Sequence, residues 1–335
     1  MGLAAVLGCG SQDAGGGAST SPTSAGATST AATEAGEAST GSGTQVVTTV
    51  EASSSSTSVV DGSSSLGESS GGEPDERGCP GSAPSAWIAC EGFEGITDPA
   101  TELSQWNVNG DGFAVETGVG VDGGQGLRVR LQPGVMFGGW VTLRFGQGPA
   151  APAVDSPDGR WDELWLRYRL RTGADWPGRP IGDVAELIAM NGANWGIAAD
   201  LNLHGEGSMR IAARGWTCVF EGQLACDGSN DWTGVLQNIS SAEGSTVVFD
   251  AGHADTWQCI EAHMRLNTPG LADGEAQVWI DGEAEIEQTG IDWRGTWDDF
   301  GLNAVRFTNY AEPVAAPLDF AIDDVVVGTA RVGCG

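Results

Sequence analysis

The sequence predicts an all-β protein, an antiparallel β-sandwich that follows a long unstructured N-terminal segment. Composition favours strands, because glycine is abundant at 53 residues and tryptophan contributes 13. Along residues 79–335, short segments alternate apolar and polar side chains between Gly, Asp, Pro and Asn turns, and no long run has helical periodicity. Many short strands bounded by turns are typical of a sandwich.

The first quarter of the chain cannot form a core. Residues 10–78 are almost entirely Ser, Thr, Gly, Ala and acidic residues, with a few scattered valines and one leucine. Such a composition buries too little apolar surface to offset the entropy of ordering, so we expect a disordered linker. The remaining residues, 79–335, suit one sandwich domain.

The extreme N-terminus suggests a lipid anchor. The stretch Val6-Leu-Gly-Cys9, followed by a low-complexity tether, resembles a bacterial lipoprotein cleavage site, in which Cys9 becomes the lipidated N-terminus. Residues 1–9 would then be the remnant of a signal, and the protein would be exported to the outer membrane or cell surface. Only eight residues precede Cys9 and none is basic, so a chance cysteine is the alternative.

Charge and cysteine content restrict the partners and the compartment. A net charge of −30 argues against nucleic acid, whose phosphates need clustered cations. Six cysteines in residues 79–335 suggest three disulfides in an exported domain, and Cys218 with Cys226 is the pairing we expect across a hairpin end. The other pairings stay open.

No metal or cofactor is expected. Three histidines and the absence of a Cys-x-x-Cys motif argue against structural zinc. Acidic loops at 107–111 and 298–299 contain oxygen ligands of the kind that Ca²⁺ prefers. Neither has an EF-hand pattern, so we expect solvated turns there.

Alternation predicts the strands and the residues that leave the core. The expected strands are 126–131, 140–145, 163–171, 194–204, 208–214, 246–250, 258–267, 276–281, 303–310 and 318–327. Asp281-Gly282 predicts a tight hairpin turn, and a short helical turn is expected at 183–190. The polar residues expected on outward strand faces include Arg167, Arg169, Arg171, Asn202, His204, Arg306 and Tyr310.

Two stretches resemble a known family. Cys90-Glu-Gly-Phe-Glu-Gly near the start and Asp319-Phe-Ala-Ile-Asp-Asp-Val-Val-Val-Gly near the end look like the first and last strands of the concanavalin A-like jelly roll. That fold is shared by lectins, glucanases and several polysaccharide lyases. The segment 257–282 is similar to secreted polysaccharide-lyase-like proteins of this group. The resemblance implies a jelly-roll β-sandwich over most of residues 88–334.

Jelly-roll alginate lyases carry an Arg-x-Glu-x-Arg strand, a Gln-x-His strand and a Lys-x-Gly-x-Tyr strand, in that order. Similar stretches occur here in the same order: Arg167-Tyr-Arg169-Leu-Arg171, Asn202-Leu-His204 and Arg306-Phe-Thr308-Asn-Tyr310. They depart from the family at Arg169 for Glu, Asn202 for Gln, Arg306 for Lys and Thr308 for Gly.

The resemblance implies a lipid-anchored lyase that cleaves uronate-containing polysaccharide by β-elimination. The proton at C5 of a uronate is removed only when its carboxylate is neutralised, and a positioned Tyr or His then acts as base. Tyr310 would be base and acid, His204 an alternative base, and Asn202 with Arg306 or Arg167 would neutralise the carboxylate. Arg167, Arg169, Arg171, Trp195 and Trp216 would contact the polymer.

Other interpretations stay open. Tyr310 and His204 would be ordinary surface residues, and the three arginines a solvated face with cross-strand salt bridges. The competing function is a monomeric, non-catalytic glycan-binding or adhesion module of the same fold, or a structural protein without a ligand. A glycoside hydrolase is disfavoured because the Glu-x-Asp-x-x-Glu motif of related glucanases was not found, the nearest acidic alternation being 283–287.

Overall fold

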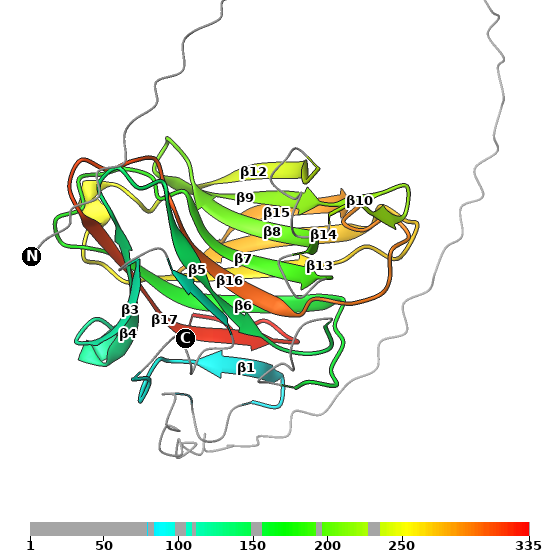
Figure 1. Ribbon diagram of the computed structural model, residues 1–335, viewed down its shortest axis with the longest axis horizontal. Helices are drawn as coiled ribbons and strands as arrows, with labels where there is room; N and C mark the ends of the chain where they lie inside the picture. The colour runs from blue at the N-terminus through cyan, green and yellow to red at the C-terminus, as the bar shows by residue number, and fades with distance from the viewer. Residues whose placement is uncertain are drawn as a thin grey trace, which may run out of the picture. The chain divides into compact units, whose positions relative to one another are not determined.

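The computed structural model describes residues 79, 84–97, 105–108, 112–148, 156–191, 196–226 and 235–334 (Figure 1). The predictions for the linker, for Cys9 and for Trp195 lie outside these residues. Over the described part of the chain, no helix has both the length and the hydropathy needed to span a bilayer.

Strands make up most of the regular structure of these residues, which also contain the short 3-10 helices η1 Val121–Gly123 and η3 Ala251–His253. Their bounds are β1 Trp87–Glu91, β2 Gln105–Val108, β3 Phe113–Thr117, β4 Gln125–Leu131, β5 Phe137–Arg144, β6 Glu163–Thr172, β7 Asp183–Met190, β8 Ile197–Gly205, β9 Arg210–Thr217, β10 Val219–Phe220, β11 Gln223–Leu224, β12 Gln237–Val247, β13 Gln258–Arg265, β14 Gly274–Ile280, β15 Glu283–Ile291, β16 Ala304–Tyr310 and β17 Leu318–Gly328.

Fifteen of these strands form two antiparallel sheets in a jelly-roll sandwich, and β10 and β11 pair as a separate two-stranded sheet (Figure 1). The eight-stranded sheet has the order β15-β14-β13-β6-β17-β4-β3, with β1 paired to β17, and the seven-stranded sheet has the order β12-β9-β8-β7-β16-β5-β2. Most neighbours are distant in sequence, so the chain repeatedly crosses between the sheets. The all-β sandwich predicted from alternation and turn spacing is confirmed.

The core lies between the two sheets. On β6, Leu164, Leu166, Tyr168 and Leu170 alternate inward and are almost completely buried. Tyr168 meets Phe307 of the opposite sheet edge to face, with ring centroids 5.5 Å apart. Each fully buried side chain of this size contributes about 1.5–3 kcal/mol to folding.

Residues 183–190 form the strand β7, so the expected helical turn is wrong. Ala185 and Leu187 face the core, while Glu186 and Ile188 are buried on the other side. A short segment buried on both faces lacks the alternation that distinguishes a strand from a helical turn.

The sequence predicted a strand at 246–250, but the strand in this region, β12, begins at Gln237 and ends at Val247. Most of its side chains are polar and exposed at the sheet edge, and such a segment lacks the apolar alternation on which the prediction relied. By contrast, Asp281 and Gly282 form the expected turn between β14 and β15, with φ of 49° and 89°.

Three disulfides link Cys79 to Cys90, Cys218 to Cys226 and Cys259 to Cys334. The last of these holds the C-terminus on the eight-stranded sheet. Beside it, the fully buried Glu261 accepts hydrogen bonds from the Val332 amide at 2.7 Å and from Arg331 Nε at 2.9 Å. Covalent and polar contacts therefore join the C-terminal segment to β13.

We expect the Cys259–Cys334 and Cys218–Cys226 disulfides to contribute differently to the free energy of unfolding. Cys259–Cys334 closes 75 residues and Cys218–Cys226 closes 8, and the entropy removed from the unfolded chain grows with loop length. A disulfide typically contributes roughly 2–4 kcal/mol to the free energy of unfolding. Replacing Cys259 and Cys334 with serines should cost an amount near the upper end of this range, and replacing Cys218 and Cys226 an amount near the lower end. Urea unfolding of both double variants checks this order, and equal losses would contradict it.

Candidate active site on the seven-stranded sheet

A row of polar side chains crosses the outward face of the seven-stranded sheet, which is the face away from the core. In register, Asn202 of β8 lies between Arg214 of β9 and Glu186 of β7. Glu186 lies opposite Arg306 of β16, which in turn lies opposite Thr142 of β5. Neighbours in a register share a face of the sheet, so five adjacent strands contribute to one polar row.

A buried ion pair forms the centre of the row. The side chains of Glu186 and Arg306 are only 2% and 5% exposed, and Arg306 donates to the Glu186 carboxylate through Nε. Thr308 Oγ1 and Asn202 Nδ2 each donate to Glu186 Oε1 at 3.3 Å. Burial raises the pKa of Glu186, while the charge of Arg306 opposes that shift. The pair therefore holds β7, β8 and β16 together at the site.

Three consecutive outward residues of β8 have unused hydrogen-bonding atoms. Asp200, Asn202 and His204 are each no more than 5% exposed. Asp200 Oδ1, Asn202 Oδ1 and His204 Nδ1 are buried and have no hydrogen-bond partner among the described residues. Buried polar atoms in folded proteins nearly always have partners, so this line of atoms indicates a place where a ligand supplies them.

The surroundings of His204 define its tautomer. Its Nε2 lies 2.8 Å from Glu206 Oε1, which also accepts from Arg214 at 2.6 Å. An ionised carboxylate only accepts hydrogen bonds, so Nε2 carries the ring proton and Nδ1 presents a lone pair. Burial lowers the pKa of His204 below its ordinary 6.5. His204 is therefore a neutral imidazole whose basic nitrogen, Nδ1, has no hydrogen-bond partner among the described residues.

The pKa values of two carboxyl groups on this face, Asp200 and Asp183, are raised, whereas the pKa of Glu206 is lowered by its hydrogen bond with His204. Burial raises the pKa of Asp200 well above its usual range, and the charge of Glu186 raises it further. Burial also raises the pKa of Asp183, whose register partner is His204. These shifts favour the protonated forms of Asp200 and Asp183, which can donate a hydrogen bond to a ligand and add no negative charge to the site.

Tyr310 lies at the end of β16 on the same face as Arg306 and is 39% exposed. A Cβ atom at Gly182 would lie 2.9 Å from Cδ1 of Tyr310, so the glycine lets the ring approach the beginning of β7. The chain has two tyrosines, and Tyr168 is wholly buried in the core. Tyr310 is therefore the tyrosine that a substrate on this face can reach.

The structure brings most of the predicted site residues onto one face. Trp216 of β9 lies opposite Asp200 in register and is half-buried. The residues placed together on the outward face of the seven-stranded sheet are Asn202, His204, Trp216, Arg306 and Tyr310.

Arg167, Arg169 and Arg171 were expected to contact the same substrate, but they do not lie on this face. All three lie on β6, in the eight-stranded sheet. Arg169 pairs with Asp324 at 3.1 Å, and Arg171 pairs with Asp255 at 3.3 Å and covers the ring of Trp257. Alternation predicts which side chains share a face of a strand, but it does not predict the sheet to which the strand belongs. The three lyase-like stretches follow one another in the expected order, yet the first lies in a different sheet from the other two.

Sequence reasoning missed Glu186 and Asp183, the acidic residues of β7. Asp183-Val-Ala-Glu186 matches the last four positions of the Glu-x-Asp-x-x-Glu motif, and this signal could have found them. At the first position of the motif stands Ile181, which is fully buried. The acids thus reach the site, but the pattern of the related glucanases is incomplete.

No metal centre is evident in the part of the chain that the structure describes, where no three His, Cys, Asp or Glu side chains are grouped to hold an ion. In the acidic loop at residues 298–299, Asp298 pairs with Arg294 at 3.3 Å. The indole Nε1 of Trp297 donates to Asp299 at 3.1 Å. Both acids therefore have protein partners.

No protein-family profile and no curated protein matches the chain. Among solved structures, it is similar to an endo-β-1,4-glucuronan lyase from the fungus Trichoderma reesei, with 14% identity and a TM-score of 0.47 over 69% of this chain and 92% of that one. A PL-14 alginate lyase from Aplysia kurodai has 14% identity and a TM-score of 0.46, covering 66% and 88%.

A binding domain is also similar in fold. The receptor-binding domain of botulinum neurotoxin type G has 13% identity and a TM-score of 0.39, covering 75% of this chain and 49% of that one. Likeness at these levels concerns architecture alone, and the three proteins differ in what they do. The activity must therefore be argued from the residues of the site.

Proposed function

We propose that the protein is a polysaccharide lyase that cleaves a uronate-containing polymer by β-elimination. The observation that carries the proposal is the buried, unpartnered line of Asp200 Oδ1, Asn202 Oδ1 and His204 Nδ1. His204 Nδ1 in this line is a neutral base, and Asp183, opposite His204 in register, is a carboxyl group of raised pKa. Elimination from a uronate needs both a base at C5 and neutralisation of the adjacent carboxylate.

The proposed reaction uses three side chains of this face. Asp183, protonated, donates a hydrogen bond to the uronate carboxylate and lowers the cost of the negative charge that develops there. His204 Nδ1 takes the C5 proton, the C4–O bond breaks as the C4–C5 double bond forms, and the Tyr310 hydroxyl protonates the departing oxygen. A proton then returns from His204 to Tyr310 through solvent.

Asn202 and Arg306 take different roles from those expected at first. Asn202 Nδ2 is engaged with Glu186, so its free Oδ1 suits a sugar hydroxyl rather than a carboxylate. Arg306 is held by Glu186 and acts as a positioning residue. Trp216, beside Asp200, offers a ring on which a neighbouring sugar can stack.

One observation favours the second candidate, a non-catalytic glycan-binding module. The two arginines nearest the line are engaged by carboxylates, Arg306 by Glu186 and Arg214 by Glu206. A uronate carboxylate would thus meet a neutral acid rather than a free cation. Binding without turnover is the outcome that this arrangement would give if Asp183 alone cannot neutralise the substrate.

The test is incubation of the chain with alginate, glucuronan, pectate and glycosaminoglycans while the ultraviolet absorbance of unsaturated uronate is followed. We expect the absorbance to rise with one of these polymers, and to rise much more slowly for Tyr310→Phe, which lacks only the hydroxyl. Retention on a polymer in an affinity gel, without any rise, would instead support the glycan-binding module.

The pH profile should reflect the shifted groups. Because burial lowers the pKa of His204 below 6.5, the base stays unprotonated in mild acid, and the acid limb of kcat/KM should lie below that value. Because the pKa of Asp183 is raised, activity should fall as pH rises through it, and Asp183→Asn should remove this alkaline limb. An acid limb above 6.5 would contradict the assignment of the base.

We also propose that the protein is exported and tethered by a lipid on Cys9. The three disulfides support export, because such bonds persist in oxidising compartments. Labelling of the full chain with a fatty-acid analogue in a bacterial host should require Cys9 and be absent from Cys9→Ser. We propose a monomer that contacts the membrane only through this anchor.

A further inference from the structure

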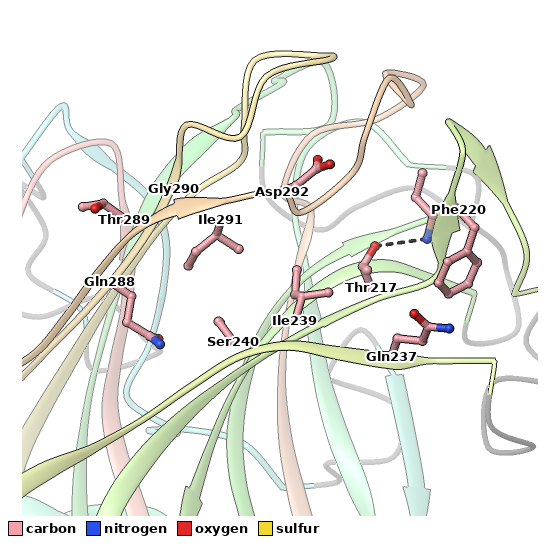
Figure 2. Close-up of a pocket in the computed structure, with 11 residues that line it drawn as sticks. Thr217, Phe220, Gln237, Ile239, Ser240, Gln288, Thr289, Gly290, Ile291 and Asp292 are labelled. Carbon is pink, nitrogen blue, oxygen red and sulfur yellow. Dashed lines mark hydrogen bonds between the residues drawn. The ribbon is translucent and has the colours of Figure 1, made fainter. Parts of the chain in front are cut away.

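The edges of the two sheets approach each other at one side of the sandwich. Near one end, the Glu285 carboxylate of β15 accepts hydrogen bonds from the Ser245 amide at 2.5 Å, Ser245 Oγ at 2.8 Å and the Thr246 amide at 3.0 Å of β12. Further along, the strands leave a cavity of about 600 Å³ between them (Figure 2). The edge strands are therefore joined at one end and open at the other.

The cavity combines apolar and hydrogen-bonding walls. Figure 2 shows Ile291 and Gln288 of β15 facing Ile239 and Ser240 of β12, with the ring of Phe220 at the side. Ser240 Oγ and Gln288 Oε1 are buried and have no hydrogen-bond partner among the described residues. A hydroxyl and an amide left without partners, next to aliphatic side chains, indicate a ligand that has both hydroxyl groups and an apolar face.

This cavity is separate from the candidate active site. Thr217 of β9 lines it and is 4% exposed, while its neighbour Trp216 lies in register with Asp200 on the outward face. Successive residues of a strand point to opposite faces. A ligand in the cavity thus enters between the sheet edges and does not contact the row around His204.

We infer that the cavity is a second carbohydrate site that binds a neutral saccharide. Its volume falls within the range of about 300–1,000 Å³ typical of small-molecule sites. Among the described residues that line it, Asp292 is the one charged side chain, and arginine, lysine and histidine are absent. A negative charge without a cation disfavours a uronate, whereas the amides of Gln237 and Gln288 suit the hydroxyls of a neutral sugar.

The test is calorimetric titration of the full chain with neutral oligosaccharides of glucose, mannose, galactose and xylose, and with an alginate trisaccharide. We expect saturable binding of at least one neutral sugar, weaker by about tenfold or more in Ile239→Arg and Gln288→Ala. Leu271→Arg is the matched control, because Leu271 is 57% exposed and does not line the cavity. Its affinity should equal that of the unmodified chain.

Three outcomes would overturn the inference. They are no saturable binding by any neutral sugar, equal binding by Ile239→Arg, and preference for an extended peptide, which exposed edge strands can also pair with. The titrations with neutral sugars record binding and involve no uronate turnover. Their result is therefore independent of whether the lyase proposal holds, and repeating them with His204→Gln separates the two sites.

Discussion

His204→Gln is expected to lower kcat for elimination by about 10²- to 10⁴-fold, the contribution of a positioned general base. Glutamine keeps a hydrogen-bonding group of similar length toward Glu206 but has no nitrogen that can accept a proton. The polymer should therefore still bind, with KM little changed, while the chemical step slows. Steady-state rates of uronate elimination, with KM determined separately, check this expectation.

His263→Gln is the matched control. His263 is 3% exposed, has Nε2 2.9 Å from Glu163 and has Nδ1 without a partner among the described residues, as His204 does. It lies on β13 in the other sheet and is stacked on Trp165 at 4.3 Å. A buried histidine nitrogen without a hydrogen-bond partner is therefore not sufficient by itself to identify a catalytic base. Equal loss of activity in both variants would show that His204 acts through stability.

Glu186→Leu is expected to destabilise the fold by about 3–5 kcal/mol, because it leaves the Arg306 guanidinium buried without a counter-charge. It also removes the acceptor of Thr308 and Asn202. The midpoint of urea unfolding measures the loss. A loss of less than about 1 kcal/mol is typical of a solvent-exposed ion pair. Such a result would contradict the burial of the Glu186–Arg306 pair.

The double variant Glu186→Leu with Arg306→Met separates stability from activity. Replacing both members of a buried ion pair with apolar residues of similar volume is often neutral or stabilising, so we expect recovery of most of the lost stability. Activity should not recover, because Asn202 loses its contact with Glu186 and its Oδ1 is no longer oriented. Recovery of both would show that the pair has no role in positioning.

Alternation in the sequence was enough to predict which side chains of β8 and β16 leave the core. Asp200, Asn202 and His204 oppose Leu201 and Leu203 at a period of two, and period is a local property. The tight turn at Asp281 followed from the same local chemistry. These features needed no knowledge of the partners of each strand.

Pairing between distant strands could not be predicted in this way. Arg167 and His204 look equivalent in alternation, yet β6 and β8 belong to different sheets. Glu186 was missed because β7 is buried on both faces and lacks an alternating pattern. The cavity beside Ser240 arises where two sheet edges diverge, and nothing local to either strand encodes that separation.

The mass of the products released from a susceptible uronate polymer tests the central claim most directly. β-Elimination predicts oligosaccharides lighter by one water than hydrolysis products, with a double bond in the new terminal sugar, and predicts that His204→Gln forms them far more slowly than His263→Gln. Products of hydrolytic mass would contradict the claim and assign the reaction to the carboxyl groups of Asp183, Glu186 and Asp200. Retention of the polymer without any product would leave the outward face of the seven-stranded sheet as a glycan-binding surface.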